Sequence, residues 1–282
     1  MYAAQLIVLG LITGAVLSLI GVGFTIVIGV GKIANFAQGA FVGLGMYMGY
    51  WANVHLGWSP YLTVLPGLVL FGICGWIVAE LFESRGRNSG AIGELLVGLA
   101  LLLLITGLLS VSFGENAVTL PAASYGAVSV ANLHIPVSEL IAAGFTFSVA
   151  AGIYLFMRWS RWGRALRAVA ENPRAAGLYG IRVPIARRVA VLVSIVLAGV
   201  TGIMISPFSV LTPEVGTTFL LTAFAVVIIG GIANTVGAVA AGLAIGLADS
   251  FAAGYLSSVW TTLAPLILIL LFLLIRPVKV QI

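Results

Sequence analysis

Few side chains in this sequence could carry out acid–base, nucleophilic or metal chemistry, and they are scattered along the chain. The 282 residues include two histidines, one cysteine and eight acidic residues. No HExxH motif, carboxylate pair or histidine–nucleophile set lies within one segment. The stretch GVGKI at 29–33 ends like a phosphate-binding loop, but Ile26 and Ile33 replace the glycine and the hydroxyl residue that such a loop needs. The sequence therefore predicts a chain that is not an enzyme, with no catalytic, cofactor-binding or metal-binding residues.

The acidic residues also argue against a carrier driven by protons. Such a carrier needs a carboxyl group near the middle of the membrane that changes its charge during the cycle. Glu94 lies one turn into an apolar segment, and we expect Asp249 near the outer end of another, so neither is placed centrally. We therefore expect the energy for any transport to come from a partner protein.

Two glycine-rich segments resemble each other and interrupt long apolar stretches. Residues 24–46 and 224–246 both run from an apolar helix through glycines and Ile-Ala-Asn to Gly-Ala and a helix of small residues. Such breaks can line a transport pathway, because the backbone groups they free need protein or water as partners. Close helix packing, with amide side chains capping helix ends, explains them equally well. The candidate pathway or gate residues are Asn35, Phe36, Gln38, Gly39, Gly231, Asn234 and Gly237.

A short polar helix is predicted within the most polar part of the chain. Asn172 precedes Pro173, so a first helix ends near Glu171 and a second begins with an asparagine cap and a proline at its first position. Gly180 suits the left-handed position that follows a helix, which gives a helix over 173–179.

This helix is too short to be stable alone in water and needs a surface on which to dock. Ala175, Ala176 and Tyr179 form one predicted face, with Leu178 beside it and a charged rim nearby. Its apolar residues favour docking to a soluble partner, whereas its basic residues favour the membrane surface. The residues alone leave both possibilities open.

The elements that hold these segments are long apolar helices. The chain is 61% hydrophobic and only 7% charged, whereas soluble domains are about a quarter charged. Its apolar runs are hydrophobic on every face, which excludes the alternating pattern of a membrane β-barrel. We therefore predict an all-α polytopic membrane protein, one transmembrane domain over 1–282, with about eight or nine spans. The predicted spans are 5–28, 37–53, 60–82, 92–113, 137–157, 188–207, 217–232, 237–253 and 260–276.

Charge sets the predicted orientation. Eight of the 13 basic residues fall within 158–188, and short loops rich in Lys and Arg stay in the cytoplasm. Counting outward from this cytoplasmic loop places the connection 114–136, which has no Lys or Arg, outside the cell. The N-terminus then lies outside and the C-terminus inside, and both glycine-rich segments have the same orientation. Transporter repeats are often inverted copies instead, and the sequence leaves this alternative open. The net charge of +5 needs no nucleic-acid partner to explain it.

Three stretches together resemble the permease family of branched-chain amino-acid ABC importers, the LivH-type subunit. Residues 162–204 are similar to the family segment that carries a coupling helix, and NFAQGAFVGLGMY at 35–47 and residues 228–250 resemble two other family blocks. The resemblance implies a type II importer permease in the bacterial inner membrane, and the likeness of residues 24–46 and 224–246 predicts an internal repeat. The coupling helix falls on Glu171–Gly180. The residues implied to couple to an ATPase are Arg167, Glu171, Asn172, Pro173, Arg174, Ala175, Ala176, Leu178, Tyr179 and Gly180.

The resemblance also implies the partners and the role of the chain. These are a second, LivM-type permease, two ATPase subunits that bind ATP and magnesium, a periplasmic or lipid-anchored solute-binding protein, and membrane lipid. The family's His-Gly-Glu reads Gln38-Gly39-Ala40 here, so leucine-type specificity does not follow automatically. The implied solute is a branched-chain amino acid or a related small polar molecule. Urea, short amides and aromatic or other organic acids are alternatives, and a secondary transporter or a channel is a weaker one.

Overall fold

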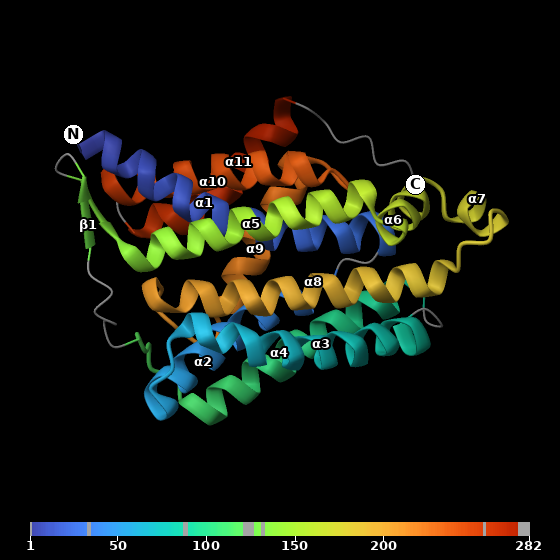
Figure 1. Cartoon of the computed structure of the whole chain (residues 1–282), viewed down its shortest axis with the longest axis horizontal. Coiled ribbons are helices and arrows are strands. Elements are labelled where there is room, and N and C mark those ends of the chain that lie inside the picture. Colours follow the sequence, from blue (N-terminus) through green and yellow to red (C-terminus); the bar gives the residue numbers. More distant parts are fainter. Residues whose placement is uncertain are drawn as a thin grey trace.

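The chain folds into a bundle of helices that run roughly along one axis (Figure 1). The computed structural model describes residues 2–32, 35–86, 90–120, 127–130, 133–255 and 258–275. The α-helices are α1 (Tyr2–Ile26), α2 (Ala37–Leu56), α3 (Pro60–Leu81), α4 (Gly90–Phe113), α5 (Val137–Trp159), α6 (Arg161–Glu171), α7 (Pro173–Leu178), α8 (Val183–Ile205), α9 (Val215–Gly230), α10 (Thr235–Tyr255) and α11 (Ser258–Ile275). The shorter elements are the π-helical turns η1 (Val27–Gly31) and η2 (Phe82–Gly86), the 3-10 turn η4 (Ser206–Phe208) and the strands β1 (Ala127–Val130) and β2 (Leu133–Pro136). The predicted all-α polytopic class is confirmed.

Six helical segments among the described residues are long and apolar enough to cross a membrane. They are Ala3–Gly31, Pro60–Ser84, Ile92–Phe113, Val137–Trp159, Val183–Phe208 and Thr235–Tyr255. The predicted spans 37–53 and 260–276 correspond to α2 and α11, which are not among the six, and α9 is apolar but shorter. The predicted count of eight or nine spans therefore stays a prediction, as does the description of 1–282 as one domain.

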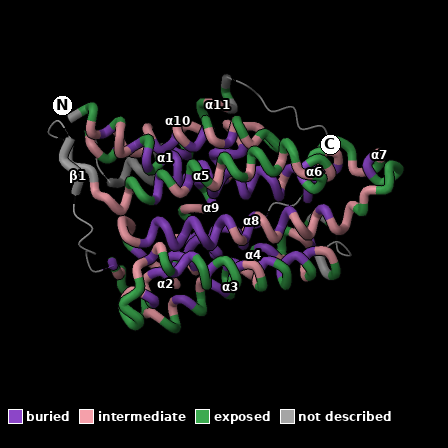
Figure 2. Tube along the Cα trace, viewed as in Figure 1, coloured by how far each residue is buried: buried purple, intermediate pink, exposed green. Residues whose placement is uncertain are grey.

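The centre of the bundle is formed by α1 and α8 (Figure 2). Residues 14–27 are all buried, and so is every residue of α8 from Leu197 to Ile205. The outer helices α3 and α4 instead expose large apolar side chains such as Leu65 and Leu103. This pattern suits a bundle whose rim meets hydrocarbon, because lipid tails leave exposed leucines without an energetic penalty.

Small residues allow the central helices to approach closely. Gly14 of α1 packs against Leu243 and Gly246 of α10, and Gly10 packs against Leu247, so α1 and α10 are antiparallel. Likewise, Gly39 of α2 lies against Gly216 of α9. Association between membrane helices depends on such close backbone contacts, since hydrocarbon provides no hydrophobic drive between helices.

The predicted polar loop and the predicted outer connection lie at opposite ends of the bundle. In Figure 1, α7 projects beyond one end of the bundle with α6 at that same end, while β1 lies at the other. The predicted connection 114–136 contains an antiparallel hairpin, with Val128 paired to Ile135, which the sequence reading treated only as a loop. Val118 also bridges to Leu211, so this connection meets the one that follows α8. The arrangement agrees with the predicted separation, and the sidedness itself stays a prediction.

Candidate functional site: two helix breaks, a cavity and a projecting helix

The first helix break lies between α1 and α2 and is deeply buried. The α1 helix ends in the π-helical turn η1, and Lys32 then takes a left-handed conformation with a φ of 57°. Asn35 is fully buried, and its side-chain oxygen accepts a hydrogen bond from the Ala37 backbone N–H at 3.1 Å. Asn35 therefore closes the turn that starts α2, while its buried Nδ2 has no hydrogen-bond partner among the described residues. Residues 33 and 34 lie outside the described residues.

Gln38 connects three helices from within this break. Its Nε2 donates to the Ile20 carbonyl of α1 at 2.8 Å, and its Oε1 accepts from the Ser194 hydroxyl of α8 at 2.7 Å. The side chain is fully buried, so both bonds lie in an apolar surrounding where an unpaired amide would be costly. Gln38 thus ties α2 to the two helices at the centre of the bundle.

The second break, between α9 and α10, is a compact turn closer to the surface. Gly231 has a φ of 89° and Ala233 a φ of 63°, so the chain reverses through positive-φ residues. The Asn234 side chain accepts from the Gly237 N–H at 2.9 Å and so caps α10. Gly230 and Gly237 lie in direct backbone contact across the turn. Asn234 itself is exposed.

The two breaks touch each other. Gly29 in the first packs against Ala233 in the second, and the rings of Phe24 and Phe224 meet edge to face at 4.6 Å. Since α1 and α10 are antiparallel and α9 turns back directly into α10, α1 and α9 run in the same direction. Both glycine-rich segments therefore have one orientation, as the charge pattern predicts.

The predicted pathway residues thus occupy packing and capping positions in this conformation. Phe36 packs on Phe224 with ring centres 5.6 Å apart, and Gly39 provides the contact with α9. The structure brings the residues of both breaks to one region, yet none of the seven lines the cavity that lies between α1, α9, α10 and α11. Their role as a pathway or gate stays a prediction.

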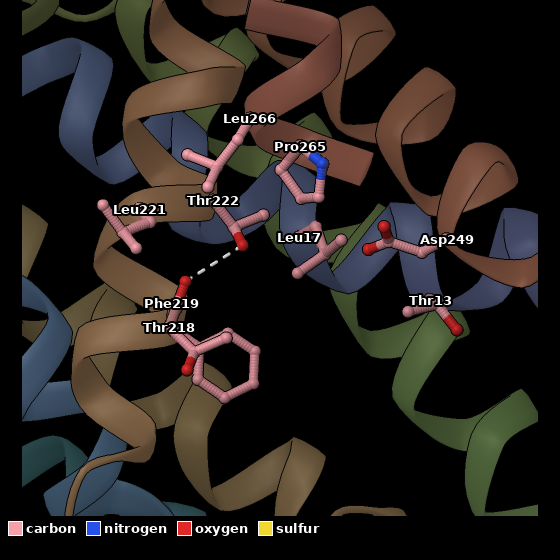
Figure 3. A pocket seen from close by; sticks show the side chains of 9 residues that line it. All are labelled: Thr13, Leu17, Thr218, Phe219, Leu221, Thr222, Asp249, Pro265 and Leu266. Carbon is pink, nitrogen blue, oxygen red and sulfur yellow. Dashed lines mark hydrogen bonds between the residues drawn. The ribbon is translucent and has the colours of Figure 1, made fainter. Parts of the chain in front are cut away.

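That cavity has a volume of about 180 Å³ and contains a carboxyl group (Figure 3). Asp249 of α10 lines it, with Thr13 from α1 and Thr218 and Thr222 from α9. The Oδ1 atom of Asp249 is buried, and no described residue forms a hydrogen bond with it. The apolar lining comes from Leu17, Phe219, Leu221, Pro265 and Leu266.

The predictions from sequence gave Asp249 no role in binding or catalysis. Asp249 lies six residues before the end of α10, about 9 Å at 1.5 Å per residue, which agrees with the expected depth. The sequence did not predict that this face of α10 lines a cavity. The helix is apolar on all sides, so its inner face has no distinguishing pattern. One signal in the sequence could have identified Asp249: an acidic residue within an apolar span costs free energy and therefore indicates a functional role.

The predicted polar helix is present and is capped as expected. The α6 helix ends at Glu171, and the Asn172 side chain accepts from the Ala175 N–H at 3.0 Å to cap α7. Gly180 takes the left-handed conformation with a φ of 82°. The α7 helix ends at Leu178, one residue earlier than predicted, because Tyr179 already departs from helical geometry.

The predicted docking face of α7 is divided by the structure. Ala176 is buried against the rest of the chain, since the Gly180 turn carries Ile181 back so that its N–H bonds the Ala176 carbonyl at 3.1 Å. Leu178 and Tyr179 point away and are 89% and 88% exposed. The expectation of a single face with Ala175, Ala176 and Tyr179 was therefore wrong.

An apolar groove of about 500 Å³ adjoins the turn after α7. Trp162, Ile181 and Ile185 contribute apolar walls, with Arg161 and Arg182 beside them. Arg167 lies elsewhere: it lines a pocket with Arg158 and Thr235, so it does not share a surface with Leu178. The remaining predicted coupling residues lie between the end of α6 and the turn after α7: Glu171, Asn172, Pro173, Arg174, Ala175 and Gly180.

The structure is that of a multi-pass membrane protein of the permease class. Its apolar helices are joined by close glycine contacts, two of its spans are broken, and a polar segment projects from one end. The chain belongs to the family described as "Branched-chain amino acid transport system / permease component", whose model matches residues 6–275.

Two curated relatives extend along almost the whole chain. The high-affinity branched-chain amino acid transport system permease protein LivH of Escherichia coli K12 is 26% identical over 291 residues, which cover 98% of this chain and 94% of the relative. The corresponding permease protein BraD of Pseudomonas aeruginosa is 28% identical over 288 residues, covering 97% and 94%. No solved structure matches the chain significantly.

Proposed function

We propose that this chain is the membrane-spanning permease subunit of an ATP-driven, binding-protein-dependent importer in the bacterial inner membrane. A second permease, two ATPase subunits and a solute-binding protein complete the importer, and ATP hydrolysis takes place in the ATPase subunits. The proposal places the α6–α7 segment in the cytoplasm, the N-terminus outside and the C-terminus inside. It is supported by the family membership and by the charge of the 158–188 loop.

The observation that carries the coupling role is the exposure of Leu178 and Tyr179. These two large side chains stand almost fully exposed at the C-terminal end of the six-residue helix α7, one as its last residue and the other directly after it. Such residues act as anchors when a partner's pocket encloses them. The adjoining groove beside Trp162 gives the same partner further apolar contact. An ATPase subunit seated here would hold the short helix in place.

Motion of α7 has a direct route into the bundle. The chain passes from α7 through the Gly180 turn into α8, and Ser194 of α8 bonds Gln38 of α2. Closure of the ATPase dimer would displace α7 and favour one arrangement of α8 and α2 over the other. This is a population shift, and it requires the ATPase to bind the two arrangements with different affinity.

The proposed solute is a branched-chain amino acid or a related small polar molecule, by analogy with the names of the relatives. The alternatives are urea, short amides and aromatic or other organic acids carried by the same machinery. In all of these cases the binding protein selects the solute, and the permease passes it with weaker contacts.

The test replaces the exposed pair on α7 in the assembled importer. Leu178→Asp and Tyr179→Asp together should abolish ATP-driven uptake in proteoliposomes, since loss of a buried anchor costs about 2 kcal/mol or more. The ATPase rate should also lose its stimulation by loaded binding protein. The control variants Leu178→Met and Tyr179→Phe keep the apolar contact and should retain uptake.

Two results would contradict the proposal. Full uptake by the double aspartate variant would exclude α7 as the docking helix. Uptake by this chain alone, driven by an ion gradient or running passively without nucleotide, would favour a secondary transporter or a channel. Ala176 is unsuitable for this test, because a large substituent there disrupts buried packing.

A further inference from the structure

The cavity around Asp249 presents hydrogen-bond acceptors to its interior. The Thr13 hydroxyl donates to the Leu9 carbonyl at 3.0 Å. The Thr222 hydroxyl donates to the Thr218 carbonyl at 3.0 Å, which is the dashed line in Figure 3. A hydroxyl has one proton, so both oxygens keep only acceptor capacity. An ionised Asp249 is also acceptor-only, and its Oδ1 has no partner.

Among the described residues that line the cavity, none has a positive side chain to balance this carboxyl group. The nine lining residues include no Lys, Arg or His. Asp249 is only partly exposed and its Oδ1 is buried, and a carboxylate in such a place is costly unless a positive group pairs with it or it takes up a proton. A cation that donates hydrogen bonds would supply the missing partner.

The walls indicate what else the cation carries. Leucines, a proline and a phenylalanine surround the acceptors, so most of the lining suits hydrocarbon. A metal cation such as calcium would need six to eight oxygen ligands, and this lining offers only a carboxylate and three hydroxyls. A solute whose only charge is negative would meet acceptors and a carboxylate here, whereas an amino acid avoids this when its ammonium group enters the cavity and its own carboxylate stays outside.

We propose that this cavity binds the primary ammonium group of a small solute, with Asp249 as its counter-ion and the apolar walls around its hydrocarbon part. The inference rests on the proposed function, in which the chain conducts such a solute. It separates the alternatives that the sequence leaves open, because an amino acid carries an ammonium group, whereas urea, short amides and simple organic acids do not. Asp249 would then lie on the solute's path.

The first test measures ligand binding by the assembled importer in nanodiscs without its binding protein. The probe is 3-methylbutylamine, which is a cation at neutral pH, and its neutral counterpart is 3-methylbutan-1-ol. The amine should raise the unfolding temperature of the wild type and of Asp249→Glu, but not that of Asp249→Asn. The alcohol should have no such selective effect. Glu214→Gln, which removes an exposed carboxylate outside the cavity, is the matched control and should respond like the wild type.

The second test measures leucine uptake driven by ATP and loaded binding protein. Asp249→Asn should lower kcat/KM by about 30-fold or more, as expected when one member of a desolvated charge pair is removed. Thr222→Val keeps the shape of the side chain but removes one neutral hydrogen-bond acceptor. It should lower kcat/KM by a smaller factor, about several-fold. Glu214→Gln should remain near the wild-type value, and Asp249→Glu, which keeps the negative charge on a longer side chain, should lose less than Asp249→Asn.

Several results would overturn the inference. In the first, the amine stabilises the wild type and Asp249→Asn equally. In the second, the amine does not stabilise the wild type. In the third, sodium ions stabilise the wild type and Asp249→Asn abolishes this effect. Unchanged leucine uptake by Asp249→Asn would also overturn it and leave the proposed function intact. If the wild type shows no ATP-driven uptake, the proposed function fails, while the amine titration still reports on the cavity. If Asp249→Asn does not insert, the wild-type titration decides.

Discussion

The two helix breaks share a sequence pattern but differ in how much of the bundle depends on them. Both place Ile-Ala-Asn before a Gly-Ala pair, and each Asn closes the turn that begins the next helix. Asn35 is fully buried, whereas Asn234 is exposed. The first break also has one more residue between its Asn and its Gly, and that segment contains Gln38.

This difference teaches that similar residues can form a structural junction in one place and a simple turn in another. Gln38 bonds α1 and α8 from the first break, and the matching segment of the second break has only Thr235 and Val236 before its glycine. We therefore expect variants in the first break to affect the stability of the whole bundle. Variants in the second should act on the start of α10.

The largest effect is expected at Gly39. A side chain there would collide with the Gly216 carbonyl of α9, and two backbones cannot move apart cheaply in a packed bundle. Gly39→Ala should lower the unfolding free energy by about 1–3 kcal/mol, and Gly39→Trp should prevent folding. For the alanine variant, the measurement is the unfolding temperature in detergent, detected by tryptophan fluorescence. For the tryptophan variant, it is the retention volume on a sizing column.

Gly107→Ala is the matched control, because nothing lies within 4 Å of a methyl group at that position. It should leave the unfolding temperature near that of the wild type. If Gly39→Ala keeps the wild-type stability but stops transport, Gly39 acts as a gate and the packing interpretation is wrong.

The fold class and the cap signals were predictable from sequence because they depend on local chemistry. Asn172, Pro173 and Gly180 predicted α7 to within one residue, since caps and positive-φ positions have strong residue preferences. The helix faces were not predictable. Ala176 was expected on the docking face with Leu178 beside it, but Ala176 is buried and Leu178 is exposed, because the Gly180 turn covers one side of α7.

The same limit explains the interior of the bundle. Uniformly apolar helices carry no periodic signal, so the sequence could not show that Gln38 reaches Ile20 and Ser194, or that Asp249 faces a cavity. The hairpin at β1 and β2 was missed for another reason: its strands are only four residues long each, which is short for recognition by alternation.

An intermediate effect is expected at Gln38. Gln38→Leu leaves the Ile20 carbonyl and the Ser194 hydroxyl without their partner, and each unsatisfied buried group costs about 1–3 kcal/mol. A double-mutant cycle with Ser194→Ala isolates the bond between them, and the two losses should not add, because the serine hydroxyl can be lost only once. Unfolding free energies of the four proteins provide the measurement, and strict additivity would show that the bond carries no stability.

The smallest effect is expected at Asn234, and it provides the direct comparison with Asn35. Asn234→Ala removes the cap of α10 and should cost about 1 kcal/mol, because water can replace the lost acceptor at an exposed turn. Asn234→Ser should recover most of this loss. Asn35→Ala leaves the Ala37 N–H without a partner in a buried site, where water cannot reach it, and should cost more. Hydrogen exchange at the Gly237 and Ala37 amides would report each turn separately. Equal losses in stability for the two alanine variants would mean that burial does not distinguish the two breaks, and that the first is no more a junction than the second.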